Sequence, residues 1–318
     1  MGNYTITDYR PGLAGLWDSA VAASRNGTFI LTRPYMDYHA DRFADRSLLI
    51  ADDSGRTVAL FAAATAPDSD SVVAAHPGLT YGGLLPAMNL GGAAILEIMA
   101  LVADHYRQQG YTALTVKPVP HIYHRQPADD DIYALWRLGA TMSACRLSAA
   151  MRPADCLPPD TNTRRNIGRA EKNGIIVTES TDIDAFHAML AQNLAERHNG
   201  ATPVHTAAEL RLLACRFPEN IRLVTARNAT DGDLLGGCLL FITDTCVHTQ
   251  YIASTPRGRE LRALPAVFSA LIADCPRTWL DFGTSNEAGG HVLNEGLLRQ
   301  KYGFGARGVV YPEFTLNL

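Results

Sequence analysis

The sequence predicts a mixed α/β chain of the α+β class, built as two similar halves. Its 318 residues are enough for two domains at roughly 100–200 residues each. In each half the same order of elements recurs: a helix, a strand–turn–strand hairpin, a third strand, a helix, a buried strand, a second helix and a last strand. Antiparallel hairpins followed by a strand–helix–strand crossover are typical of the α+β class. The repetition indicates an internal duplication.

Hydrophobic periodicity and turn residues define the elements of the first half. Gly110 and Gly139 mark helix ends, because glycine commonly follows the last helical turn. The expected elements are a helix over 14–24, a hairpin over 47–65, a third strand over 71–83, a helix over 93–110, a buried strand over 113–120 and a helix over 129–140.

The second half repeats this order, including its last strand. Pro265 must lie in the first turn of its helix or kink it. The expected elements are a helix over 183–198, a hairpin over 220–243, a third strand over 246–255, a helix over 260–275, a buried strand over 278–285, a helix over 292–303 and a strand over 308–316.

A proline-rich stretch separates the two halves. Pro153, Pro158 and Pro159 predict a linker over residues 153–163. The predicted domains are therefore 1–152 and 164–318, and the last strand can also pack on the first domain.

Charge and composition narrow the class of protein. The net charge is −4 with a pI of about 6.2, so the overall field does not favour nucleic acid or an anionic membrane. Six cysteines form no Cys-x-x-Cys pair, and no apolar run reaches the ~18 residues of a membrane span. We expect a cytoplasmic protein without a membrane span, a metal or a tightly bound cofactor.

Residues 164–174 concentrate positive charge. Arg165, Arg169 and Lys172 are spaced to share one helix face, with Arg164 beside them. Arginine offers paired donors to phosphates. The segment is therefore either an anion-binding site or a solvated surface helix.

Two further segments combine aromatic, histidine and arginine side chains. In residues 33–43 the candidates for substrate binding are Tyr35, Tyr38, His39 and Arg42. In residues 121–127, after a buried strand, they are His121, Tyr123 and Arg125. Such side chains can grip a ring, a sugar or a phosphate, and strand ends commonly border a ligand crevice. The alternative for both segments is internal hydrogen bonding, and two histidines without a third ligand are weak evidence for a metal.

The strand over 248–255 offers polar side chains to a cleft. Simple alternation would place His248 with Gln250 on one face and Thr249 with Tyr251 on the other. Gln250 and Tyr251 are therefore candidate substrate contacts, and a polar structural strand is the alternative.

Polar residues follow the last buried strand. Asp281 lies inside that strand, so it needs a partner or a raised pKa. No Gly-x-Ser-x-Gly elbow is present, which argues against a serine nucleophile. Lys301 either stabilises a developing oxyanion or caps the last helix. The other candidates in this stretch are Ser285, Glu287 and Asn294.

These motifs, in this order, resemble the tandem GNAT fold of the FemABX-like acyl- and aminoacyltransferases. The resemblance covers nearly the whole chain and rests on "RRNIGRAEKNGI", "TQYIAST" and "LDFGTS…NEGLLRQKYGFGA". It implies transfer of an activated acyl or aminoacyl group to the amine of a small molecule or peptide. It also implies that Arg164 and Arg165 hold substrate phosphates and that Lys301 stabilises the tetrahedral intermediate. Asp281 or Glu287 is then a candidate for deprotonating the amine.

The donor is a separate question. A typical GNAT domain holds the coenzyme A pyrophosphate on a glycine-containing loop before the central helix, where backbone N–H groups approach the anion. Here Arg262 and Leu264 stand where that loop has glycine or a small residue. This departure favours an aminoacyl-tRNA donor. An acyl-coenzyme A donor and a non-catalytic cleft-binding protein are the alternatives.

Overall fold

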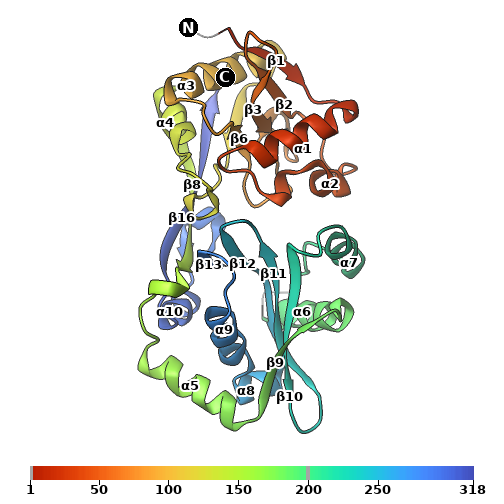
Figure 1. The fold of residues 1–318 in the computed structure, drawn as a ribbon, viewed down its shortest axis with the longest axis vertical. Helices are drawn as coiled ribbons and strands as arrows, with labels where there is room; N and C mark the ends of the chain where they lie inside the picture. The colour runs from red at the N-terminus through yellow and green to blue at the C-terminus, as the bar shows by residue number, and fades with distance from the viewer. Residues whose placement is uncertain (1–2, 198–200) are drawn as a thin grey trace. The chain divides into compact units, whose positions relative to one another are not determined.

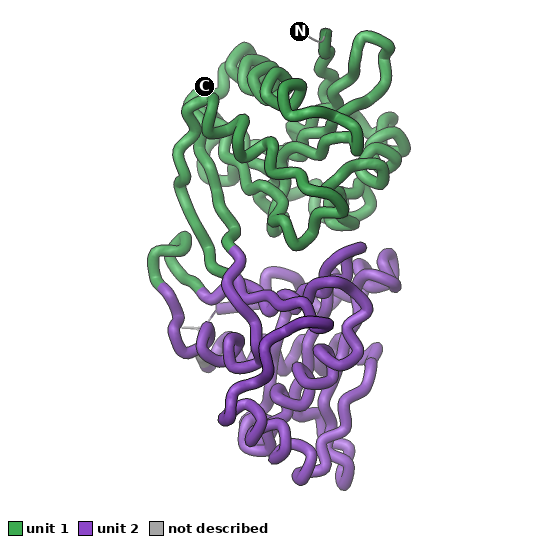
Figure 2. Tube along the Cα trace, turned by 60° about the vertical axis from the view of Figure 1, so that its left-hand side comes forward, with its two compact units in different colours: residues 1–147, 286–292, 310–318 green, residues 148–285, 293–309 purple. Residues whose placement is uncertain are grey.

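The computed structural model describes residues 3–197 and 201–318 (Figure 1). The chain divides into two compact units, coloured separately in Figure 2. Unit 1 comprises Met1–Leu147, Asn286–Val292 and Val310–Leu318, and unit 2 comprises Ser148–Ser285 and Leu293–Val309. Two long strands, β8 and β16, contribute residues to both units.

Unit 1 contains strands of three sheets, the smallest being the pair β14 (Asn286–Glu287) and β15 (Val292–Leu293), and four α-helices among its described residues. Its helices are α1 (Ala14–Ala23), α2 (Arg33–Met36), α3 (Gly92–Gln108) and α4 (Asp130–Arg137), with short 3-10 turns that include η3 (Asp37–His39) and η4 (His121–Tyr123). Its strands are β1 (Thr5–Asp8), β2 (Leu48–Ala51), β3 (Thr57–Ala62), β4 (Ala64–Ala66), β5 (Ser69–Ala74), β6 (Gly83–Pro86), β7 (Ala113–Val116), β14 (Asn286–Glu287) and parts of β8 (Thr141–Met151) and β16 (Arg307–Asn317).

The core of unit 1 forms around α3. One set of strands has the order β1-β2-β3-β6, and the second runs β4-β5-β7-β16-β8. Ile95, Ile98, Met99 and Val102 of α3 are buried in this core, at the spacing expected for one helix face. β16 pairs antiparallel with β7, with Phe314 opposite Val116.

Unit 2 is a mixed sheet with helices on both faces. Its helices are α5 (Thr161–Lys172), α6 (Ile183–Arg197), α7 (Ala207–Arg216), α8 (Pro256–Leu261), α9 (Ala263–Ala273) and α10 (Glu295–Gly303). Its strands are β9 (Ile175–Ser180), β10 (Ile221–Asn228), β11 (Leu234–Ile242), β12 (Cys246–Ser254), β13 (Trp279–Thr284) and the inner ends of β8 and β16. β15 (Val292–Leu293) lies where the chain passes from unit 1 to unit 2.

The sheet of unit 2 has the order β8-β13-β12-β11-β10-β9. Figure 1 shows α9 on one side of these strands and α6 on the other. Two adjacent glycines of β11 permit this close packing, because neighbouring strand residues point to opposite faces. A Cβ on Gly236 would lie 3.4 Å from Ala263 Cβ of α9, whereas a Cβ on Gly237 would lie 3.3 Å from the Phe186 ring of α6.

The observed elements differ from the expectations in two respects. The single helix expected over 260–275 is two helices, because Arg262 adopts φ 67° between α8 and α9. Pro265 lies in the first turn of α9, as required. The strand β9 and the helix α7 were not anticipated, whereas β8 is the strand expected at the end of the first half. The expected helix over 183–198 is α6, and residue 198 lies outside the described residues.

Among the described residues, no helix is both long and apolar enough to cross a membrane. The longest, α3, has 17 residues and carries charged and polar side chains.

Gly305 provides a test of the packing in unit 2. Its φ is +99°, and a Cβ there would lie 2.1 Å from the Leu157 carbonyl oxygen. Gly232 also has positive φ (+75°), but a Cβ on Gly232 would meet nothing within 4 Å. We expect Gly232→Ala to lower the free energy of unfolding by about 1 kcal/mol. Gly305→Ala should cost at least about 3 kcal/mol, because the backbone must also move. Urea titrations followed by circular dichroism measure both, and equal losses would contradict this account.

Candidate active site

The two parallel strands β12 and β13 separate partway along their length. They pair only at Cys246 with Trp279, Val247 with Leu280 and His248 with Asp281. Beyond that point β12 continues along β11, and β13 runs beside β8. A gap between parallel strands exposes backbone groups that a ligand can bind. We call this point of separation the fork.

A β-bulge lies immediately beyond the fork. Leu240 pairs with Thr249 and Leu239 with Tyr251, so Gln250 has no opposite residue in β11. The extra residue corrects the expected alternation: Thr249 and Tyr251 point to opposite faces, and Tyr251 shares a face with His248. Bulges of this kind re-aim groups beside active sites.

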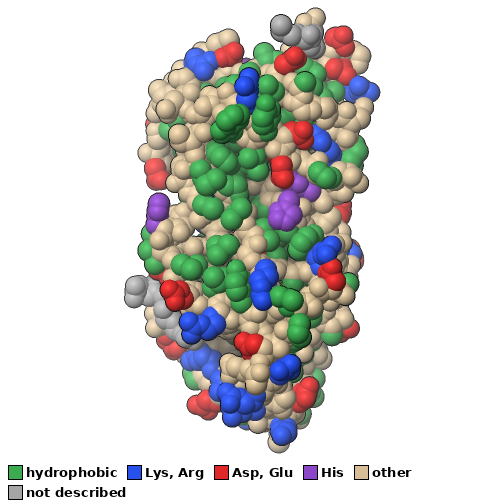
Figure 3. Space-filling model, turned by 90° about the vertical axis from the view of Figure 1, so that its left-hand side faces the viewer, with side chains coloured by type: hydrophobic (Ala, Val, Ile, Leu, Met, Phe, Trp, Pro, Cys, Tyr) green, Lys and Arg blue, Asp and Glu red, His purple; other side chains and the backbone are tan. Residues whose placement is uncertain are grey.

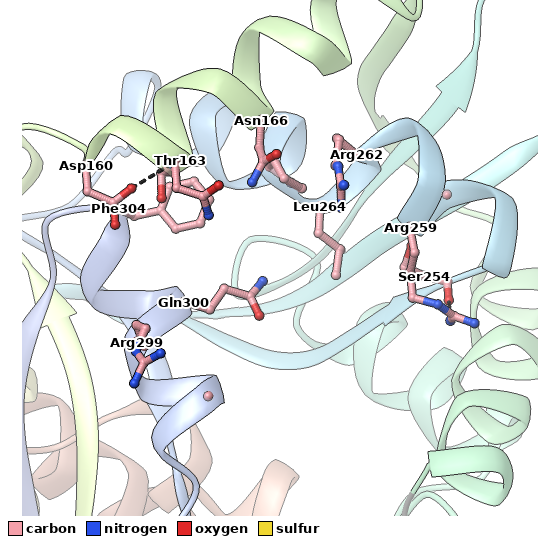
Figure 4. A pocket seen from close by; sticks show the side chains of 14 residues that line it. Asp160, Thr163, Asn166, Ser254, Arg259, Arg262, Leu264, Arg299, Gln300 and Phe304 are labelled. Atoms are coloured by element: carbon pink, nitrogen blue, oxygen red, sulfur yellow. Dashed lines mark hydrogen bonds between the residues drawn. The ribbon is translucent and has the colours of Figure 1, made fainter.

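A cavity of about 520 Å³ opens on the α9 side of the sheet (Figure 4). Four helices and the end of β12 line it: α5, α8, α9 and α10 with Ser254. In Figure 4, Asn166 of α5, Gln300 of α10 and Leu264 of α9 point into the space, whereas Arg259 turns towards Ser254. Arg259 donates a hydrogen bond to the Ser254 carbonyl at 2.8 Å. The volume is within the usual range for small-molecule sites.

The start of α9 gives this cavity a positive end. The first N–H groups of a helix have no intrahelical acceptor and favour an anion. No side chain caps α9, and Arg262 at its N-cap lines the cavity. The left-handed backbone of Arg262 is the conformation that glycine adopts readily, which accounts for the glycine of the typical loop. Pro265 removes one N–H donor from this first turn.

Asp281 lies at the fork and is fully buried. Its Oδ1 accepts hydrogen bonds from the Ser148 hydroxyl at 2.5 Å and from the Gly283 N–H at 3.0 Å. Its Oδ2 lies 2.7 Å from His248 Nδ1. The need for partners that the sequence predicted is thus met by residues of β8, β12 and β13.

Lys301 holds the end of β13. It is 5% exposed, and its Nζ donates to the carbonyl oxygens of Gly283 at 2.7 Å and Thr284 at 2.8 Å. Burial lowers the pKa of Lys301 from 10.5 to about 8, although the charge of Asp281 acts to raise it. The side chain therefore binds inside unit 2 next to the fork instead of capping its own helix.

The other candidates in unit 2 lie in different settings. Arg164 and Arg165 are exposed on α5, and Arg165 donates to Asn162, which lines the cavity. The Tyr251 hydroxyl lies 2.6 Å from His205 Nδ1. Ser285 is buried, and its hydroxyl has no hydrogen-bond partner among the described residues. The Asn294 side chain caps α10 through the Leu297 N–H.

In unit 1, the candidates of residues 33–43 form an aromatic cluster. The Tyr35 ring packs edge-on against Tyr38, and Tyr38 packs against His39. Tyr35 and His39 are buried, whereas Arg42 is exposed and lies over the Tyr38 ring. The structure therefore brings these four residues together.

The three candidates of residues 121–125 have different surroundings. His121 is exposed in η4, and the Tyr123 hydroxyl lies 2.9 Å from the Tyr311 hydroxyl of β16. Arg125 donates to carbonyl oxygens at the end of α1, including that of Ala22 at 2.7 Å. Glu287 is exposed on β14, also in unit 1.

Sequence reasoning passed over several residues of this site: His248, Ser148, Asn166 and Gln300. His248 had a usable signal, since it begins the polar strand over 248–255 that was predicted to line a cleft. Asn166 and Gln300 are polar residues on helices, and only the packing of α5 and α10 beside α9 brings them to one cavity.

We compared the chain with protein-family models, curated proteins and solved structures. Residues 160–288 match the model of the Acetyltransferase (GNAT) domain family. Among solved structures the chain is similar to FemX, at 12% identity and a TM-score of 0.71, over 99% of this chain and 97% of FemX. A comparison with curated proteins finds no match.

Two further solved structures share the fold. One is the C-terminal domain of a putative lysylphosphatidylglycerol synthetase from Agrobacterium fabrum, at 9% identity and a TM-score of 0.58, over 96% of this chain and 92% of that one. The other is a tandem GNAT protein from the clavulanic acid biosynthesis pathway. It has 12% identity and a TM-score of 0.52, over 99% of this chain and 98% of that one.

The class that these comparisons define is one of fold: a tandem GNAT fold in which residues 160–288 match the GNAT acetyltransferase domain model. The predicted FemABX-like tandem GNAT fold is confirmed, and unit 2 carries nearly all of the matched GNAT domain.

Lys301 makes a testable contribution to the pH dependence of stability. Its folded pKa of about 8 lies below the ordinary value of 10.5. Between these values the unfolded chain binds more protons, so the free energy of unfolding should rise with pH by roughly 3 kcal/mol from this group. Lys301→Met should abolish that rise in denaturant titrations from pH 7 to 10.5. Lys172→Met, at an exposed lysine of α5, is the matched control and should follow the parent. Identical pH profiles for parent and Lys301→Met would contradict the burial effect.

Proposed function

We propose that this chain is an N-acyltransferase that transfers the acyl group of an acyl-coenzyme A to the amine of a small molecule or peptide. One observation carries the proposal: the fork between β12 and β13 lies in the same unit as a cavity at the uncapped start of α9. The extended part of a thioester donor fits between the separated strands. Its phosphates fit the positive end of the cavity.

The cavity supports a phosphate-bearing donor through three kinds of donor group. The N–H groups at the start of α9 favour an anion, Arg262 adds a full charge, and Asn166 and Gln300 add amide donors. Arg299 of α10 also lines the cavity. An arginine at the glycine position of the loop is therefore compatible with phosphate binding, because its guanidinium can replace backbone donors.

Lys301 and the fork account for stabilising the transition state and for positioning the reactants. The amine attacks the thioester carbonyl carbon, and negative charge develops on the carbonyl oxygen. Lys301 donates two of its three N–H bonds to the Gly283 and Thr284 carbonyls. The proposal assigns the third to this oxygen, where a positioned cation stabilises the transition state. Holding both reactants in one gap itself contributes a large rate enhancement.

An aminoacyl-tRNA donor is the second candidate. Arg164, Arg165, Arg169 and Lys172 are exposed on α5, and Asn162 and Asn166 of the same helix line the cavity. Figure 3 shows several Lys and Arg side chains gathered on this part of unit 2. Such a face can bind a nucleic-acid backbone despite the overall net charge of −4.

Binding of free coenzyme A tests the donor. At about 100 times its dissociation constant the ligand should stabilise the protein by roughly 2.7 kcal/mol, seen as a raised melting temperature. Arg262→Gln should weaken coenzyme A about tenfold by calorimetry, because a charged hydrogen bond is lost. Arg257→Gln is the matched control. Arg257 lies on α8 but pairs with Asp231 and Asp233, so its loss should leave affinity unchanged.

Three outcomes separate the candidates. Coenzyme A binding with acyl transfer supports the proposal. Absence of coenzyme A binding together with transfer from a labelled aminoacyl-tRNA mixture, lost in Arg164→Ala/Arg165→Ala, supports the second candidate. Absence of transfer from either donor supports a non-catalytic binding protein.

A further inference from the structure

The Asp281 network contains a histidine that the acyl-transfer scheme above does not use. His248 Nδ1 lies 2.7 Å from Asp281 Oδ2, and the other oxygen of Asp281 is occupied by Ser148 and the Gly283 N–H. The histidine side chain is 13% exposed, whereas Asp281 is fully buried. A buried carboxylate with fixed partners can orient an imidazole that still reaches solvent.

The position of His248 along the strand places it at the reacting end of the fork. His248 and Asp281 form the last pair of β12 and β13 before the strands separate. Gly283, two residues further on in β13, lies beside the imidazole: a Cβ there would be 3.5 Å from His248 Cε1. Glycine at this position leaves the space next to the ring unfilled.

The cavity and the His248 imidazole lie on opposite faces of the sheet. Val247, Leu280 and Phe282 pack into the core beneath α9, on the side of the cavity. Their neighbours His248 and Asp281 therefore point to the opposite face, where α6 packs. A donor bound in the cavity would approach the fork from one face. The imidazole lies on the opposite face, and an acceptor amine can reach the fork from that face.

The carboxylate also determines the tautomer. Asp281 Oδ2 is an acceptor, so the proton of a neutral His248 lies on Nδ1. The basic lone pair then belongs to Nε2, at the far side of the ring. The same base-and-carboxylate arrangement orients the general base of hydrolytic triads.

We propose that His248 is the general base of this enzyme and that Asp281 is its positioning residue; this rests on the proposed function. The acceptor nitrogen forms a C–N bond to the thioester carbonyl carbon. The C–S bond breaks, and its electron pair leaves with the sulfur as the coenzyme A thiolate. The proton released from nitrogen passes to His248 Nε2 and then to solvent.

The test uses the full-length protein with acetyl-coenzyme A. The acceptors are a panel of primary amines that comprises the amino acids, spermidine, ethanolamine and short peptides. Released thiol is measured by disulfide exchange and product by mass spectrometry. We expect His248→Gln to lower kcat at least 100-fold, while KM for acetyl-coenzyme A changes less than threefold. Added imidazole should raise the rate of His248→Ala at least tenfold, and a purely structural role would give no such rescue.

Control variants distinguish a catalytic effect from a general one. His187→Gln on α6 removes a histidine of the same unit that bonds the His205 carbonyl, and it should keep parental kcat. Asp281→Asn should lower kcat with an unchanged coenzyme A-induced shift in melting temperature. A His248→Gln variant within threefold of the parental kcat would overturn the inference and leave the proposed function standing. A parent protein that neither binds coenzyme A nor releases it would overturn both.

A second measurement needs no acceptor. Diethylpyrocarbonate modifies an accessible, unprotonated imidazole nitrogen, and peptide mapping locates the product. His248 should be modified at Nε2, because Asp281 fixes the proton on Nδ1 and 13% of the side chain is exposed. An unreactive His248 would overturn the inference, because a general base must reach its substrate.

Discussion

The architecture of unit 2 depends on the buried carboxylate of Asp281. An unpaired charge at this depth would cost several kcal/mol, so its partners are obligatory. They come from three places in the chain: Ser148 on β8, His248 on β12, and the backbone N–H of Gly283, two residues after Asp281 on β13. One side chain thus ties three neighbouring strands together where two of them begin to separate. Removing either side-chain partner would leave part of that charge unsatisfied.

The fork itself requires compensation, because separated strands leave backbone groups without ladder partners. The pairing of β13 with β8 shifts register near the end of β13. There the Lys301 ammonium donates hydrogen bonds to the carbonyl oxygens of Gly283 and Thr284. On the β12 side the bulge at Gln250 redirects the strand. These two adjustments maintain an opening in the middle of a sheet that is otherwise closed by hydrogen bonds.

The sequence predicts the order of elements better than it predicts the site. Periodicity and turn residues locate α3, α6, α10 and both hairpins, because those signals are local. Asp281 is identified as needing a partner, yet Ser148 could not be named. It lies on β8, the strand expected at the end of the first half, whose residues were not located. The bulge at Gln250 reverses the predicted face of Tyr251. The left-handed Arg262 divides a helix that looked continuous. The first of these failures concerns an interaction between segments far apart in the chain, and the other two concern the backbone at a single residue inside an otherwise regular element.

The same carboxylate acts on Lys301, the cation that the proposed reaction uses. Burial lowers the pKa of Lys301 to about 8, whereas the charge of Asp281 acts to raise it. The carboxylate therefore favours the protonated lysine, which donates to the Gly283 and Thr284 carbonyls and fixes the end of β13. Asp281 thus has two roles in the proposed chemistry: it orients the imidazole of His248 directly, and it helps to keep the oxyanion-binding group charged.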